Sequence, residues 1–218
     1  MNIPNLLSLS RIFLLPLFLY LLFHPNPWMK FAALVVFGLA SLTDLLDGWS
    51  ARKLNLESEL GKFLDPFADK VLVIATLISF LLLDPLIPLW MIIIIISRDV
   101  LITALRYVAV KKGRSIRTSR FGKWKTAFQM VSIVIIIMVF IVRSTGLDLS
   151  HQFNTDSYVK LNVVYDLLMS DHKYKYIIVT PYILMLIVTI MTAWSGLRYL
   201  FTNYKVIFPL KGEKENND

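Results

Sequence analysis

Six long apolar runs recur along this chain of 218 residues, and they limit its fold more than any other feature. Each run approaches the roughly 20 residues that an α-helix needs to cross about 30 Å of hydrocarbon. Only helices and closed barrels satisfy their backbone hydrogen bonds in lipid, so the pattern predicts an all-α membrane protein, a bundle of six transmembrane helices. The expected spans are 5–24, 28–52, 61–83, 87–110, 122–143 and 176–201.

Composition agrees with this prediction, because 56% of the residues are hydrophobic. No Gly/Ser linker or internal repeat divides the chain, so we expect one membrane domain over residues 1–204 and a polar cytosolic tail over 205–218. The first apolar run lacks a small-residue cleavage site and is expected to be retained. The absence of cysteine excludes disulfides, thiolate nucleophiles and Cys-ligated metals.

The basic residues predict the orientation in the membrane. The segment 111–125 carries seven Lys and Arg residues, whereas the turns 24–28 and 84–88 carry none. The ends of membrane helices that carry basic residues face the cytoplasm. Because the number of spans is even, both termini lie on that same side. Topology and attraction to anionic lipid headgroups then account for the net charge of +8, and nucleic acid is not an expected partner.

Carboxylates inside two of the apolar runs mark a candidate site. Two stripes follow helical spacing: Asp44, Asp47, Gly48 and Ala51 in the second span, and Gly61, Asp65 and Asp69 in the third. A carboxylate near the bilayer centre costs roughly 2.5–3.5 kcal/mol on insertion scales, so four at one level require compensation. Four converging carboxylates supply hard oxygen ligands for one or two Mg²⁺ or Mn²⁺ ions, with positions left open for a substrate phosphate.

Residues beside the carboxylates suit a ligand that carries phosphate. Gly48 and Gly61 lack side chains, which lets a bulky ligand approach the backbone. Arg52 offers charge to a phosphate oxygen, although cytosolic topology accounts for it as well. Ser58, in the short polar break, is either a turn residue or a hydrogen-bond donor to phosphate.

Structural roles compete with the metal-site interpretation. Asp65 precedes Pro66 and, taken alone, fits a helix N-cap with proline at the first helical position. The other pair, Asp44 and Asp47, also fits ion pairs between helices or the cation path of a transporter. Neither alternative explains the paired glycines.

Two further aspartates lie outside these stripes. Asp84, which precedes Pro85, is expected to be a turn residue and not a catalytic one. Asp99 stands next to Arg98, and the two are candidates for a buried ion pair.

The spacing as a whole resembles the signature of the CDP-alcohol phosphotransferase family. The matching pattern is Asp44-x2-Asp47-Gly48-x2-Ala51-Arg52-x8-Gly61-x3-Asp65-x3-Asp69. Other segments resemble the bacterial branch of this family that uses glycerol 3-phosphate as the acceptor: residues 2–7 with Arg11, 63–70, 104–106 and 122–126. The similarity covers residues 1 to about 130 and, more loosely, the last span around 194–197. It departs in the segment 144–175, which is longer than is usual, and at Asp99, where glutamate is expected.

This resemblance implies a reaction and roles for the site residues. An alcohol attacks the lipid-side phosphorus of CDP-diacylglycerol, and CMP leaves. Two Mg²⁺ or Mn²⁺ ions are held by Asp44, Asp47, Asp65 and Asp69, and Asp69 also acts as the general base. Five residues border the CDP-diacylglycerol: Gly48, Ala51, Arg52, Ser58 and Gly61. The resemblance also implies a homodimer, in the bacterial cytoplasmic (inner) membrane. The orientation predicted from the basic residues places its active site on the cytosolic side.

A basic cluster near the cytosolic ends of the fourth and fifth spans suggests the acceptor. Its members are Arg98, Arg106, Arg114, Lys123 and Lys125. Glycerol 3-phosphate is a dianion that such side chains would hold. We favour Arg106, Lys123 and Lys125 as its phosphate ligands, with positive-inside topology as the alternative explanation. Phosphatidylglycerol, serine and inositol phosphate stay open as acceptors, and a cation-coupled transporter is the more distant alternative.

Overall fold

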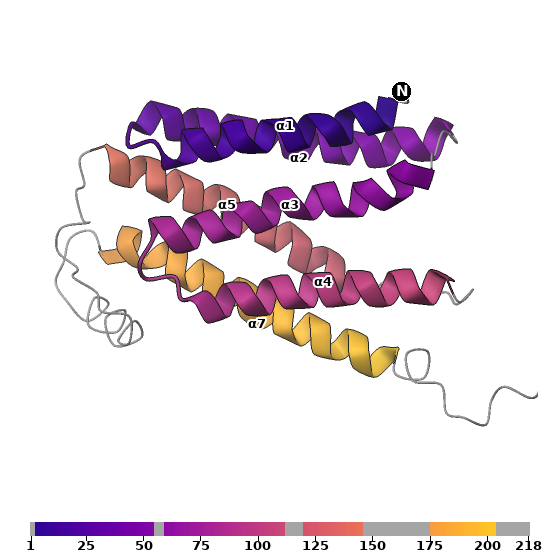
Figure 1. Ribbon diagram of the computed structural model, residues 1–218. Helices are drawn as coiled ribbons and strands as arrows, with labels where there is room; N and C mark the ends of the chain where they lie inside the picture. The colour runs from indigo at the N-terminus through magenta and orange to yellow at the C-terminus, as the bar shows by residue number, and fades with distance from the viewer. Residues whose placement is uncertain (1–2, 55–58, 112–119, 146–174, 204–218) are drawn as a thin grey trace, which may run out of the picture. The chain divides into compact units, whose positions relative to one another are not determined.

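The computed structural model describes the chain except for residues 1–2, 55–58, 112–119, 146–174 and 204–218, and it describes side chains for residues 13–42, 70–105, 107, 122, 124–145 and 175–203. The described part is all-helical, as expected (Figure 1). Its helices are α1 (Ile3–Phe23), α2 (Pro27–Leu54), α3 (Glu59–Leu83), α4 (Leu89–Lys111), α5 (Arg120–Ser144) and α7 (Lys175–Thr202). Their bounds agree with the six expected spans to within two residues.

The chain divides into two compact units. The first comprises Met1–Pro88 and Ile133–Leu184, and therefore holds α1, α2, α3, the second half of α5 and the start of α7. The second comprises Leu89–Ser132 and Met185–Asp218, with α4, the first half of α5 and the rest of α7. The single domain expected over 1–204 and the tail over 205–218 stay predictions.

In the first unit, α1 packs against both α2 and α3. The rings of Phe18 and Phe37, both buried, connect α1 and α2 with their centroids 5.8 Å apart. Asn26 caps α2, because its Oδ1 accepts a hydrogen bond of 2.9 Å from the amide of Trp28. Pro27 takes the first helical position, where its missing N–H has no helical partner to lose. The turn between α1 and α2 is thus fixed by local sequence.

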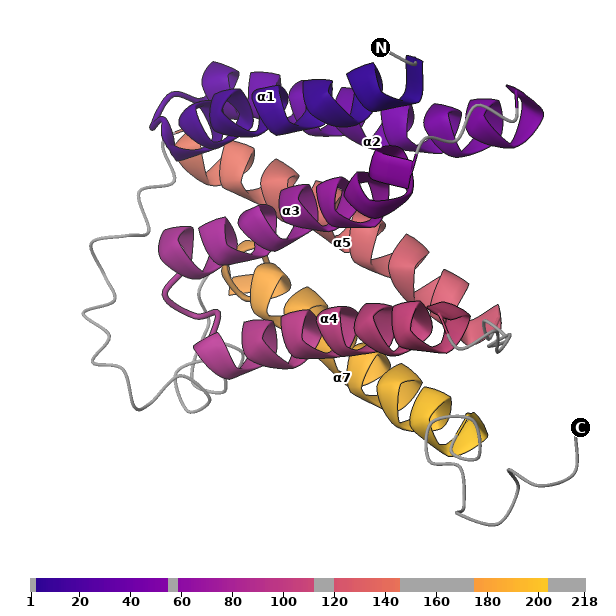
Figure 2. The ribbon, with the colours of Figure 1, turned by 45° about the vertical axis from the view of Figure 1, so that its right-hand side comes forward.

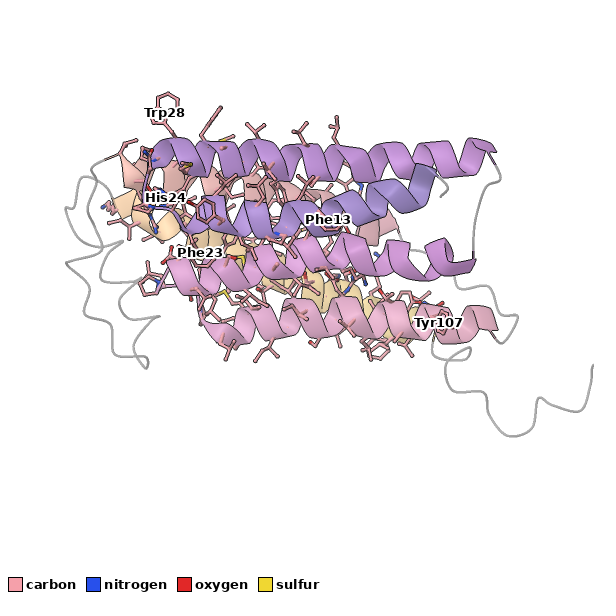
Figure 3. All side chains as sticks on the ribbon, turned by 45° about the horizontal axis from the view of Figure 1, so that its top comes forward. Phe13, Phe23, His24, Trp28 and Tyr107 are labelled. Carbon is pink, nitrogen blue, oxygen red and sulfur yellow. The ribbon has the colours of Figure 1, made fainter. Side chains whose placement is uncertain are left out.

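The helices carry apolar side chains on their outer faces as well as inside. Two described segments, Trp124–Ser144 and Lys175–Thr202, are long and apolar enough to cross a membrane. The described parts of α1, α2 and α3 contribute shorter apolar stretches. Phe13 is 73% exposed and Trp28 77% exposed, and Trp28 points away from the helices (Figure 3). Such a surface is typical of a membrane protein, which keeps apolar side chains toward lipid.

A buried ion pair joins three segments of the first unit. The carboxylate of Asp84, which is 1% exposed, accepts a hydrogen bond from the amide of Leu86 at 2.9 Å. Its other oxygen lies 2.9 Å from Nη1 of Arg143, in the last turn of α5. Nη2 of Arg143 donates to the carbonyls of Ile177 and Ile178 in α7, at 3.1 and 2.6 Å. The expected turn role of Asp84 is confirmed, and the pairing with Arg143 is an additional finding.

Pro181 explains why a side chain binds the backbone of α7. In an unbroken helix, the carbonyl of Ile177 would accept from the amide of residue 181, which proline lacks. Arg143 supplies the missing donor. Its guanidinium also lies 5.6 Å from the ring centroid of Phe140, which meets Phe80 edge to face at 5.5 Å. Arg143 therefore takes part in both the polar contacts and the aromatic packing of this unit.

Candidate functional site

The four signature aspartates lie on two helices that are joined at one end. Asp44 and Asp47 occupy the later part of α2, and Asp65 and Asp69 occupy the first part of α3. All four belong to the first unit. The helices run in opposite directions, so the end of α2 and the start of α3 both lie toward the same side of the first unit, with α2 reaching further than α3 (Figure 2).

These aspartates lie at similar distances along the chain from the ends of their helices. Asp47 lies seven residues before the end of α2 at Leu54, and Asp65 lies six residues after the start of α3 at Glu59. Asp44 and Asp69 are each ten residues from those ends. At 1.5 Å per residue, one pair is about 10 Å and the other about 15 Å along its helix from the joined ends. Both pairs therefore lie toward the ends that are consecutive in the chain, and the facing of the two stripes stays a prediction.

The remaining signature residues share this part of the fold. Gly48 and Ala51 stand four and seven residues after Asp44, on the same face of α2. Arg52 follows in the last turn of α2, and Gly61 lies in the first turn of α3. Ser58 lies outside the described residues.

The chemistry of this donor set fits a hard divalent cation. Four carboxylates offer oxygen ligands only, which is the set that Mg²⁺ and Mn²⁺ prefer over softer metals. The side chains of the four aspartates are not among those described. Among the described side chains, no group of three or more His, Asp or Glu residues is placed to hold a metal ion. The aspartate stripes therefore remain the candidate metal centre.

The three candidate ligands for the acceptor phosphate belong to the second unit. Arg106 lies in α4 and Lys123 in α5, and their side chains are not among those described. Lys125, also in α5, is only 2% exposed. Its Nζ lies 2.9 and 3.1 Å from the two carboxylate oxygens of Asp99. Lys125 thus forms an ion pair that the sequence did not predict.

Asp99 connects α4 with α5 and, through Arg98, with α7. Nη1 of Arg98 lies 2.8 Å from Oδ1 of Asp99, so the expected ion pair is confirmed, but its side chains are 17% and 21% exposed and the pair is only partly buried. Nη2 of Arg98 donates to Oγ of Ser195 in α7, at 2.6 Å. A Cβ added at Gly196 would meet Cγ of Arg98 at 3.0 Å, so the glycine makes room for the arginine stem. A small-residue pair in an apolar helix is the sequence signal that marks this close approach.

The chain belongs to the CDP-alcohol phosphatidyltransferase family, whose model matches residues 1–208. A CDP-diacylglycerol–glycerol-3-phosphate 3-phosphatidyltransferase of Bacillus subtilis is 40% identical over 149 residues, and the match covers 63% of this chain and 77% of the relative. The protein of that name from Pseudomonas fluorescens is 40% identical over 143 residues, 63% and 72% of the two chains. The one from Escherichia coli K12 is 39% identical over 138 residues, 61% and 74%. The resemblance that the signature indicates is confirmed.

Proposed function

We propose that the protein transfers the phosphatidyl group of CDP-diacylglycerol to glycerol 3-phosphate, giving phosphatidylglycerophosphate and CMP. Membership of the family and three relatives named for this reaction support the proposal. The observation that carries it for this chain is the complete signature, with two of its aspartates in the later part of α2 and two in the first part of α3.

The reaction exchanges the phosphoanhydride bond of CDP-diacylglycerol for a phosphoester bond to the acceptor. The free hydroxyl oxygen of the acceptor attacks the lipid-side phosphorus, the bond from this phosphorus to the bridging oxygen breaks, and CMP leaves with that oxygen. Asp69 accepts the hydroxyl proton as general base. Gly48 and Gly61 leave room for the nucleotide and its phosphates, and Arg52 donates to a phosphate oxygen. Ala51 and Ser58 complete this border.

The same aspartates are proposed as the metal ligands. Asp44, Asp47, Asp65 and Asp69 would hold two Mg²⁺ or Mn²⁺ ions, which agrees with their oxygen-only donor set. When bound, such ions supply positive charge that neutralises the pyrophosphate and its leaving group. They also offset the cost of four carboxylates in an apolar region.

Basic side chains of the second unit are proposed to select the acceptor. Arg106, Lys123 and Lys125 would bind the phosphate of glycerol 3-phosphate, because a dianion gains most from charged donors. A neutral acceptor such as serine would have no use for this charge. The basic residues therefore favour a phosphorylated acceptor such as glycerol 3-phosphate over serine.

We also propose that the helices cross the bacterial cytoplasmic membrane six times, with both termini and the active site on the cytosolic side. The apolar outer faces and the basic segment 111–125 support this orientation. A homodimer is proposed from the family resemblance.

Release of CMP tests the proposed function. Purified protein in detergent receives CDP-diacylglycerol and Mg²⁺ or Mn²⁺, with glycerol 3-phosphate, serine, inositol phosphate and phosphatidylglycerol offered one at a time. We expect turnover with glycerol 3-phosphate. Turnover with a different acceptor would preserve the reaction class and overturn the acceptor, whereas no turnover with any of them would contradict the enzyme and favour a transporter.

A further inference from the structure

Asp99 is the shared partner of two cations in the second unit, and we propose that it is a positioning residue for binding of the acceptor. The inference rests on the proposed function, since it concerns how glycerol 3-phosphate is held. Asp99 itself would not touch the acceptor, because a carboxylate repels a dianion. Its effect would pass through the side chains that it fixes.

The contacts show how Asp99 fixes them. Oδ1 of Asp99 lies 2.8 Å from Nη1 of Arg98 and 2.9 Å from Nζ of Lys125, and Oδ2 lies 3.1 Å from the same Nζ. The three side chains are 17%, 2% and 21% exposed for Arg98, Lys125 and Asp99. At such burial a cation depends on its anionic partner, and two neighbouring cations without it would repel each other. Asp99 therefore contributes to holding both cations in place, together with Ser195 in the case of Arg98.

The position of Asp99 also relates it to two of the proposed ligands of the acceptor phosphate. Arg106 stands seven residues after Asp99 on α4, which is about two turns along the same helix face. Lys125, whose ammonium contacts Asp99, is itself one of the three proposed phosphate ligands. The carboxylate thus shares a helix face with one candidate ligand and holds another. Together Arg98, Asp99 and Lys125 carry a net charge of one positive unit, which is the sign that an acceptor phosphate requires.

Three variants separate positioning from general stability. Asp99→Asn removes the charge and keeps the size, and Asp99→Glu keeps the charge. Asp84→Asn is the matched control. Asp84 is also a buried carboxylate that pairs with an arginine, but it belongs to the first unit. For each, we would measure KM for glycerol 3-phosphate, KM for CDP-diacylglycerol, kcat and the melting temperature.

We expect Asp99→Asn to raise KM for glycerol 3-phosphate about tenfold, the size of effect typical when charged hydrogen bonds lose a partner. The KM of this variant for CDP-diacylglycerol should change by less than about twofold, which is the size of effect expected for a substitution that does not touch the binding site. Asp99→Glu should recover most of the acceptor affinity. Asp84→Asn should lower the melting temperature and leave both KM values unchanged.

Several results would overturn the inference. An unchanged KM for glycerol 3-phosphate in Asp99→Asn would make Asp99 a purely structural residue, and a lowered KM would make it an electrostatic obstacle to the acceptor. If Asp99→Asn does not fold, Ser195→Ala is the second variant, because it removes only the hydroxyl partner of Arg98. It should raise KM for glycerol 3-phosphate about two- to threefold, as loss of one hydrogen bond does. An unchanged KM in Ser195→Ala would also overturn the inference. A wild-type enzyme that ignores glycerol 3-phosphate would overturn the proposed function, and this inference with it.

Discussion

Arg143 donates a hydrogen bond of 3.1 Å to the carbonyl oxygen of Ile177, which lacks its usual helical donor because residue 181 is proline. A side chain of α5 therefore completes the backbone hydrogen bonding of α7. The same guanidinium pairs with the buried carboxylate of Asp84 after α3. Stability of the first unit should depend strongly on this one residue.

Arg143→Met should destabilise the protein by about 3–5 kcal/mol, because it leaves the carboxylate of Asp84 buried without its cation. The melting temperature should fall by on the order of 10 °C. The five tryptophans allow unfolding in detergent to be followed by intrinsic fluorescence. The double variant Asp84→Asn/Arg143→Met should recover part of the loss, since neither charge is then buried alone. Losses that simply add would contradict the ion pair.

Pro181→Ala should make the protein less dependent on Arg143. Alanine restores an amide at residue 181 that donates to the carbonyl of Ile177, so the oxygen no longer relies on the guanidinium. The cost of Arg143→Met should then shrink by about 1 kcal/mol, the net value of one hydrogen bond. A double-mutant cycle measured by thermal unfolding checks this. An identical cost in both backgrounds would mean that Pro181 and Arg143 are not coupled.

Asp69→Asn should abolish CMP formation and leave the helical circular dichroism spectrum unchanged. Removal of a general base typically lowers the rate by about 10²–10⁴-fold. The spectrum serves as the folding control, because α3 begins ten residues before Asp69 and its helix does not depend on that carboxylate. Intact CMP formation in a folded variant would exclude Asp69 as the base.

Removal of divalent metal should stop the reaction, and Mg²⁺ or Mn²⁺ should restore it, because oxygen-only sites hold these ions reversibly. Mn²⁺ binding can also be followed without turnover, by loss of the free-ion signal in electron paramagnetic resonance. Asp44→Asn and Asp65→Asn should each weaken that binding, whereas Asp84→Asn should not. Full activity in a chelator would contradict a metal site at the four aspartates.

The helices were predictable from the sequence because apolar length and chain-breaking residues determine them. Asn26 and Pro27 begin α2, and Asp84 and Pro85 end α3, and each is a local signal. The helix spacing also placed the signature residues on shared faces of α2 and α3. Confirmation of the family came from the same spacing.

The partners of the buried charges were not predictable in the same way. Arg143 and Asp84 are separated by 59 residues, and Lys125 and Asp99 by 26 residues, so no local pattern connects them. A carboxylate in an apolar helix indicates only that some cation must pair with it. Which cation does so depends on which helices lie side by side, and the spacing within one helix does not identify its neighbour.

Phosphatidyl transfer to glycerol 3-phosphate is the reaction proposed for this chain. The most direct measurement is the transfer of label from radioactive glycerol 3-phosphate into the lipid phase, with CMP quantified in the same samples. We predict that label enters lipid mole for mole with CMP, and only when CDP-diacylglycerol and a divalent ion are present. CMP release while the label stays in the aqueous phase would contradict the claim.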